Sequence, residues 1–162
     1  MSERPQAPHQ MKIVLFQPEI PGNTGTIGRT CVGLDMELIL IRPYGFELSE
    51  KSVRRAGLDY WKYVRLTEYD DWEAFIAARR PRADQLFLFE NDRAQSAYEV
   101  EFPQDAYLVF GRETTGLSPE IIAAHEDRLV SLPMYSPHIR SLNLANIACA
   151  AAYQALRSHA LA

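Results

Sequence analysis

The sequence predicts an α/β domain in which a mostly parallel β-sheet is flanked by helices. Short, continuous apolar runs, typical of strands buried on both faces, alternate with segments whose apolar residues recur at helical spacing. This alternation is typical of a parallel sheet. The chain has 162 residues, of which 47% are hydrophobic and 23% charged, and no internal repeat or interior linker divides it. These properties indicate one folded domain.

The first two expected strands enclose the first expected helix. Lys12–Gln17 (KIVLFQ) and Glu37–Ile41 (ELILI) are apolar and rich in β-branched residues, and a proline follows each run closely. Between them, Ile27 and Cys31 lie on one helical face, which predicts a helix over 24–34.

The middle of the chain is less regular. A basic helical turn is expected over 51–56, and a short strand over Tyr63–Leu66. Asp70 and Glu73 form an acidic variant of a capping box, which predicts a helix over 71–80 that the following proline ends.

The last part of the chain repeats the alternation. Leu86–Phe89 (LFLF) and Tyr107–Phe110 (YLVF) are expected to be buried strands, with a polar loop between them. A Ser-Pro-Glu sequence opens the helix expected over 118–125, because serine suits the N-cap and proline the first helical position. The final strand is expected over Arg128–Leu132 and the final, Ala-rich helix over Asn143–Ser158.

Three polar, glycine-containing or loop stretches each follow an expected strand. They are NTGTIGR (Asn23–Arg29), LVFGRETTGL (Leu108–Leu117) and LPMYSPHIRSLNLANIACAAAY (Leu132–Tyr153). Ligands of such sheets bind beyond the carboxyl ends of the strands, and helix N-termini suit polar or anionic groups. We therefore expect the three stretches to form a single composite site.

Each stretch also has a plainer interpretation. Asn23 could simply cap a helix while Arg29 faces solvent. The segment 111–117 could be an ordinary turn before a well-capped helix, in which Glu113 holds a ribose hydroxyl, orients an arginine or faces water.

Several other chemistries fit the sequence poorly. The four histidines are scattered and no Cys/His pair has ligand spacing, so no metal site is expected. Ser141 lacks the context of a nucleophile elbow, and the glycine spacing matches neither a P-loop nor a dinucleotide-binding fingerprint. No apolar run is long enough to span a bilayer. Cys31 and Cys149 are expected to be thiols of a cytosolic protein rather than a disulfide. The net charge of −4 counts mildly against nucleic-acid binding, although arginines and lysines gather in or beside the loops.

The order of the three stretches, with FQPEIPGNTG and RRAGLDYW, resembles the SPOUT superfamily of S-adenosylmethionine-dependent RNA methyltransferases. Nearly the whole chain from Met11 onward is similar to its TrmL branch, which methylates the ribose 2′-hydroxyl of the wobble nucleotide, cytidine or uridine 34, in certain tRNAs. The resemblance implies S-adenosyl-L-methionine as cofactor, tRNA as substrate, a cytoplasmic homodimer and a trefoil knot near the C-terminal end. Residues 1–10 are expected to be a flexible leader and residues 11–162 a single methyltransferase domain.

The same resemblance implies the residues of the site. The residues expected to hold S-adenosyl-L-methionine are Phe89, Gly111, Leu132, Met134, Ser141 and Leu142. The residues expected at the reacting end are Arg29, Glu113, Asn143 and, in the dimer, Tyr153. Apart from the resemblance, we expect Arg140, Arg54 and Arg55 to contact tRNA phosphates, the alternative being that they only keep the surface soluble.

The chain departs from the pattern of this branch at three places. The loop 134–140 is one residue longer, Arg112 stands where proline or serine is common, and Ala145 stands where serine is common. The reaction type is therefore more firmly indicated than the RNA substrate. Methylation of another tRNA or ribosomal RNA site and a catalytically silent RNA-binding protein are alternatives.

Overall fold

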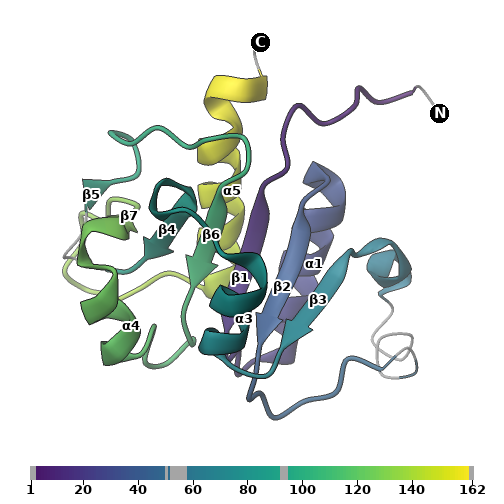
Figure 1. Cartoon of the computed structure of the whole chain (residues 1–162), viewed down its shortest axis with the longest axis horizontal. Helices are drawn as coiled ribbons and strands as arrows, with labels where there is room; N and C mark the ends of the chain where they lie inside the picture. The colour runs from purple at the N-terminus through teal and green to yellow at the C-terminus, as the bar shows by residue number, and fades with distance from the viewer. Residues whose placement is uncertain (1–2, 50, 52–57, 92–94, 161–162) are drawn as a thin grey trace.

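The β-sheet consists of parallel strand pairs. The computed structural model describes residues 3–49, 51, 58–91 and 95–160. Its strands are β1 (Lys12–Phe16), β2 (Glu37–Ile41), β3 (Leu66–Tyr69), β4 (Leu86–Phe89), β5 (Gln95–Ser96), β6 (Tyr107–Phe110) and β7 (Leu129–Ser131). They form one sheet in the order β3-β2-β1-β6-β4-β7-β5, in which every neighbouring pair is parallel (Figure 1). The predicted parallel α/β fold is confirmed.

Helices cover both faces of this sheet. The α-helices are α1 (Pro21–Leu34), α3 (Trp72–Arg79), α4 (Pro119–Ala124) and α5 (Leu144–Ala160), and the short 3-10 helices are η1 (Asp59–Tyr63), η2 (Ala83–Gln85) and η3 (Glu126–Arg128). In Figure 1, α1 and α5 lie behind the sheet and α3 and α4 lie in front. Within the described part of the chain, no helix is both long and apolar enough to cross a bilayer.

The strands supply side chains to two cores. Ile13 and Leu15 of β1 belong to the core between the sheet and the α1–α5 layer. Val14 and Phe16 point the other way, into the core that contains Phe75 of α3. Because each central strand is covered on both faces, its sequence is a continuous apolar run rather than an alternating one.

The helix α1 begins earlier than the sequence predicted. It starts at Pro21, the favoured first helical residue, and its N-cap is Ile20, which makes no side-chain capping bond. The plainer interpretation, in which Asn23 caps a helix that begins near Thr24, is therefore wrong, because Asn23 lies within the first turn. This shift leaves the Asn23 side chain free to act elsewhere.

Two other local predictions need correction. Asp71, not Asp70, caps α3, because its Oδ1 atom accepts a hydrogen bond of 2.7 Å from the backbone N–H of Ala74. The strand expected over Tyr63–Leu66 lies at Leu66–Tyr69 instead, preceded by η1. Most of the basic turn expected over 51–56 lies outside the described residues.

The domain's hydrogen bonds reach back into the expected leader. His9 is buried; its Nε2 atom lies 2.8 Å from the carbonyl oxygen of Leu34, and its Nδ1 atom accepts a bond of 3.0 Å from the N–H of Met11. The N–H of Gln10 donates to the carbonyl of Gln104 over 2.8 Å. These contacts fix the chain between the end of α1 and the segment that leads into β6.

The two cysteines are free thiols. Cys31 is fully buried in α1, and burial raises the pKa of its thiol to about 12. Cys149 of α5 is half-buried. The expectation of thiols rather than a disulfide is confirmed.

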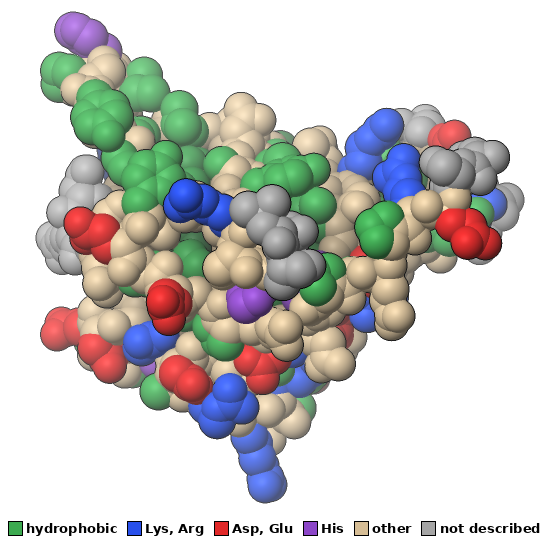
Figure 2. Space-filling model, turned by 90° about the horizontal axis from the view of Figure 1, so that it is seen from above, with side chains coloured by type: hydrophobic (Ala, Val, Ile, Leu, Met, Phe, Trp, Pro, Cys, Tyr) green, Lys and Arg blue, Asp and Glu red, His purple; other side chains and the backbone are tan. Residues whose placement is uncertain are grey.

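Part of the surface is apolar. Exposed apolar side chains on the loop between β7 and α5, and on α5, are Tyr135, Ile139, Leu142 and Tyr153. In Figure 2, an arm of hydrophobic side chains tipped by a histidine projects at the upper left, and Lys and Arg side chains gather on a second projection at the right. The surface between the projections is hollowed and carries further hydrophobic side chains. Exposed patches of this kind mark interaction surfaces.

Candidate active site

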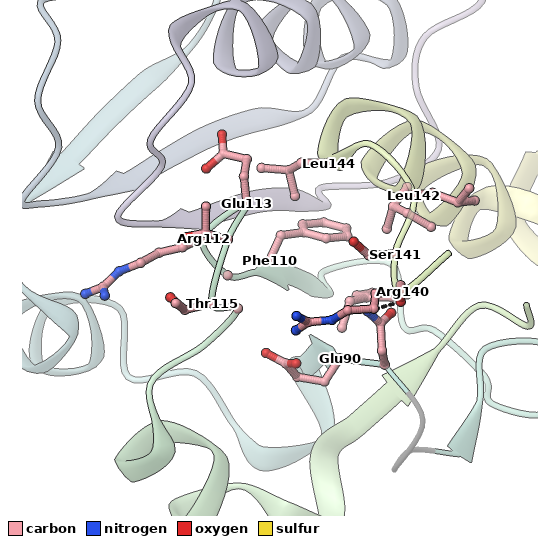
Figure 3. Close-up of a pocket in the computed structure, with 15 residues that line it drawn as sticks. Glu90, Phe110, Arg112, Glu113, Thr115, Arg140, Ser141, Leu142 and Leu144 are labelled. Atoms are coloured by element: carbon pink, nitrogen blue, oxygen red, sulfur yellow. Dashed lines mark hydrogen bonds between the residues drawn. The ribbon is translucent and has the colours of Figure 1, made fainter. Parts of the chain in front are cut away.

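A cavity lies at the carboxyl ends of β4 and β6, where the topology rule placed the site. Its volume is about 440 Å³. Phe89 and Phe110 end the two strands at the cavity, the loop 111–116 forms one wall, and the segment 140–142 ahead of α5 forms another. Figure 3 shows Glu90, which follows β4, at the same space as Arg140 and Ser141 of the segment ahead of α5.

The loop between β6 and α4 is closed on itself. Arg112 and Gly116 exchange two backbone hydrogen bonds of 3.0 Å, and Gly116 has a φ of 70°, which favours glycine. A Cβ atom on Gly111 would lie 2.1 Å from the backbone carbon of Gly116. Gly111 is therefore required by the fold of the loop itself.

Glu90 fastens this loop to the end of β4. Its Oε1 atom accepts a hydrogen bond of 2.7 Å from the N–H of Leu117, and its carboxylate lies against Gly116. Asn91 then donates from Nδ2 to the carbonyl of Arg140 over 3.2 Å. Neither Glu90 nor Asn91 is among the residues predicted from the sequence. Their position directly after a buried strand, at the same edge as the three polar stretches, was the signal that could have found them.

Glu113 joins the second stretch to the first. Its Oε2 atom accepts from the N–H of Glu19 over 2.8 Å, and its Oε1 atom accepts from the N–H of Ile20 over 3.0 Å and from Nδ2 of Asn23 over 3.4 Å. A carboxylate at this place also meets the positive end of the α1 dipole. The N-cap residue Ile20 has no side chain that can accept a hydrogen bond, and Glu113 provides a hydrogen-bond acceptor at the start of α1 instead.

The contact is reciprocal. Oε1 of Glu19 accepts hydrogen bonds from the hydroxyl of Thr114 over 2.7 Å and from its N–H over 3.1 Å. These two bonds hold the pKa of the Glu19 carboxyl below its usual value. Two acidic side chains therefore lock the start of α1 against the loop after β6.

Asn23 and Asn143 join the third stretch. Nδ2 of Asn143 donates to Oδ1 of Asn23 over 3.1 Å. Oδ1 of Asn143 accepts from the N–H groups of Ala145 and Asn146, at 2.9 and 3.2 Å, and so caps α5. Asn23 is buried and lies between Glu113 and Asn143. The three stretches therefore do converge, through the chain Glu113–Asn23–Asn143.

Two of the residues predicted at the reacting end lie away from the cavity. Arg29 is exposed on α1, and its guanidinium lies over the ring of Tyr60, 5.4 Å from the centroid. Tyr153 is 61% exposed on α5. Neither is among the described residues that line the cavity, nor is Asn143, although its neighbours Leu142 and Leu144 are. Of the residues predicted at the reacting end, only Glu113 lines the cavity.

Some of the residues predicted to bind the cofactor or RNA line the cavity, and others do not. Those that line the cavity are Phe89, Gly111, Ser141, Leu142 and, from the RNA set, Arg140. Leu132 and Met134 are half-buried in the chain after β7 and are not among the described lining residues. Arg54 and Arg55 lie outside the described residues. No group of three or more potential metal ligands occurs among residues 3–49, 51, 58–91 and 95–160.

Solved structures that superpose on this parallel sheet include RNA methyltransferases. The chain belongs to the SpoU rRNA methylase family, whose model matches residues 10–153. The resemblance seen in the sequence is confirmed.

Individual relatives and solved structures show which members of the family this chain resembles in sequence and fold. A tRNA (cytidine(34)-2'-O)-methyltransferase of Saccharophagus degradans is 42% identical over 146 residues, covering 90% of this chain and 93% of the relative. A solved structure described as "Structural insights into the 2-OH methylation of C/U34 on tRNA" superposes with a TM-score of 0.86 at 42% identity, covering 96% and 99% of the two chains. The SpoU methyltransferase AviRb of Streptomyces viridochromogenes, solved with AdoMet, has a TM-score of 0.75 at 28% identity, covering 95% of this chain and 62% of AviRb.

Proposed function

We propose that this protein transfers a methyl group from S-adenosyl-L-methionine to the ribose 2′-hydroxyl of nucleotide 34, cytidine or uridine, in tRNA. The observation that carries the proposal is the hydrogen-bonded chain Glu113–Asn23–Asn143, which joins three loops beside a ligand-sized cavity. The names of relatives at 42% identity support the tRNA substrate and the wobble position.

The residues around the cavity suit S-adenosyl-L-methionine. A volume of about 440 Å³ is typical of small-molecule sites. The rings of Phe89 and Phe110, whose centroids are 4.9 Å apart, stack beneath the cavity and make its floor apolar, as a purine ring requires. Glu90 lines the same cavity and suits a cationic group, because its Oε2 atom has no hydrogen-bond partner among the described residues. Phe89, Gly111, Ser141 and Leu142 would hold this cofactor.

The protein's part in the reaction is mainly positioning. The bound cofactor supplies a methyl group that is already activated for transfer. Ser141 fixes the geometry at the cavity, Asn143 does so through its bond to Asn23, and Glu113 holds the start of α1 in place. A guanidinium is a poor proton acceptor, so Arg29 orients the phosphate next to the target ribose and stabilises the emerging alkoxide.

This arrangement acts in a cytoplasmic homodimer with a trefoil knot. Arg29 and Tyr153 lie on the neighbouring helices α1 and α5, both exposed and outside the cavity of their own chain. In a dimer formed through the α1–α5 layer, Arg29 and Tyr153 of one protomer lie toward the cavity of its partner. Arg140 at the cavity, together with Arg54 and Arg55, contacts tRNA phosphates.

The direct test is methyl transfer from labelled S-adenosyl-L-methionine into bulk tRNA, followed by mapping of the methylated nucleotide. The expected product is 2′-O-methylated cytidine or uridine at position 34. Label at another tRNA position, or in ribosomal RNA, would establish the alternative substrate. Binding of cofactor and RNA without any transfer would instead identify a silent RNA-binding protein.

Substitution of Arg29 tests its proposed role. Arg29→Ala is expected to lower kcat by about 100-fold or more, the usual effect of removing a donor to a developing oxyanion. Arg29→Lys keeps the charge but loses the planar set of donors, so we expect it to recover only part of this loss. Steady-state kinetics with tRNA provide the measurement. Full activity of Arg29→Lys would mean that a positive charge suffices.

A further inference from the structure

We propose that Tyr60 is a positioning residue that holds the guanidinium of Arg29 in place, and that η1 is seated on α1 for this purpose. The inference rests on the proposed function of Arg29. Tyr60 belongs to the segment LDYW, which follows residues outside the described part of the chain. It touches α1 at two points, through its hydroxyl and through its ring.

Two glycines of α1 make room for the segment. A Cβ atom on Gly28 would lie 2.5 Å from Cζ3 of Trp61, and one on Gly25 would lie 3.1 Å from Cδ1 of Leu58. Glycine is disfavoured inside helices, so two of them facing one segment indicate a close approach of that segment. The indole of Trp61 therefore rests on the helix, and Tyr60 beside it cannot move freely along α1.

The hydroxyl of Tyr60 fixes the direction of its ring. It donates a hydrogen bond of 2.8 Å to the carbonyl oxygen of Gly25. Burial raises the pKa of this phenol, with Arg29 acting in the opposite sense, so the hydroxyl carries its proton at neutral pH and remains a donor. The ring is thereby anchored at both ends, by the backbone of η1 and by α1.

The contact with the Tyr60 ring leaves the N–H donors of Arg29 available for other partners. The guanidinium carbon lies 5.4 Å from the ring centroid, and among the described residues no side-chain hydrogen bond from Arg29 accompanies this cation–π contact. The five N–H donors of a guanidinium lie in its plane and point outward, as recognition of a phosphate or an oxyanion requires. Within the described part of the chain, no carboxylate pairs with Arg29. Tyr60 thus orders Arg29 without competing for its hydrogen bonds.

A spectroscopic experiment tests this placement without cofactor or RNA. We expect Tyr60→Leu, which removes the ring, to lower the order parameter of the Arg29 Nε–H bond measured by NMR relaxation. Tyr60→Phe keeps the ring and is expected to retain most of the order. Tyr63→Leu is the matched control, because Tyr63 lies on the same 3-10 helix, is 66% exposed and carries Lys62 over its ring instead. An unchanged order parameter in Tyr60→Leu would overturn the proposal.

Kinetics test the consequence for methyl transfer. Tyr60→Leu is expected to lower kcat by about 10- to 100-fold, as small misplacements of a reacting group do. The KM for tRNA and the affinity for S-adenosylhomocysteine are expected to stay close to those of the wild type. The free energy of unfolding in urea is expected to fall by only about 1 kcal/mol, the value of the one hydrogen bond to Gly25. Tyr63→Leu is expected to leave kcat unchanged.

A double-mutant cycle decides whether Tyr60 acts through Arg29. If it does, adding Tyr60→Leu to Arg29→Ala costs no further activity, because the group to be positioned is already gone. Additive losses, or a rise confined to the KM for tRNA, would show that Tyr60 acts separately, as a stacking surface for RNA. A wild-type protein without methyl transfer would refute the proposed function, whereas the NMR comparison would still decide the placement of Arg29.

Discussion

Replacing Glu113 with alanine is expected to lower kcat/KM for methyl transfer by about 100-fold or more, since a misplaced catalytic constellation loses this much. Among the described residues, only the Glu113 side chain accepts hydrogen bonds from the N–H groups of both Glu19 and Ile20. It also accepts one from Nδ2 of Asn23. Without it, the start of α1 is released from the loop after β6, and Asn23 loses the partner that aligns it with Asn143. Methyl-transfer kinetics and titration with S-adenosylhomocysteine provide the measurements.

The conservative variant sharpens this expectation. Glu113→Gln has nearly the same shape, but its amide turns one acceptor into a donor, whereas both carboxylate oxygens face backbone N–H groups. We therefore expect Glu113→Gln to lose nearly as much activity as Glu113→Ala. Either variant should also lose about 1.5–3 kcal/mol of the free energy of unfolding, the usual value of a hydrogen bond to a charged group. The exposed Glu99→Ala is the control, and near wild-type activity in both Glu113 variants would show that the three loops do not need this tie.

The elements predicted well are those whose sequence reflects burial. β2, β4 and β6 match the predicted bounds because both faces of each strand are covered, which leaves an unmistakable apolar run. β3 was misplaced because its residues are only half-buried, so its pattern is weak, while Tyr63 and Val64 have the composition of a strand but end a 3-10 helix.

The start of α1 shows the limit of local reasoning. Ile20 gives no capping signal of its own, because the acceptor for its N–H group is Glu113, 93 residues further along the chain. A pattern read over a few residues cannot contain such a partner. The proline at the first helical position was a usable local signal, and it identifies the true start.

The site was predictable in its place and less so in its chemistry. The rule that polar loops meet at the carboxyl edge of a parallel sheet correctly joined stretches separated by up to 120 residues, as the bond between Asn143 and Asn23 shows. It could not show that Glu113 accepts hydrogen bonds from the backbone of Glu19 and Ile20, nor that Glu90 fastens the loop after β6 from within the cavity. Those outcomes depend on distances that only the folded chain defines.

Gly111→Ala is expected to weaken cofactor binding so far that the affinity for S-adenosylhomocysteine falls at least about 100-fold. The reason is that the added methyl group would change the wall of the cavity. The added methyl group would lie 2.1 Å from the carbon of Gly116, 2.2 Å from the nitrogen of Leu117 and 2.7 Å from the Cα of Gly116. All three atoms are backbone, so no side chain can move aside. The loop must open, which breaks the two bonds between Arg112 and Gly116 and the bond from Leu117 to Glu90.

The same substitution elsewhere separates this effect from a general cost of alanine. Gly33→Ala in α1 meets no atom within 4 Å and replaces glycine in a helix, so it is expected to be neutral or to stabilise the fold by up to about 1 kcal/mol. Gly111→Ala is expected to destabilise by about 1–3 kcal/mol, the usual range for overpacking. Urea unfolding and calorimetric titration measure both quantities. Tight binding by a folded Gly111→Ala variant would mean that the loop 111–117 does not form the wall on which the cofactor rests, and the assignment of this cavity would have to be abandoned.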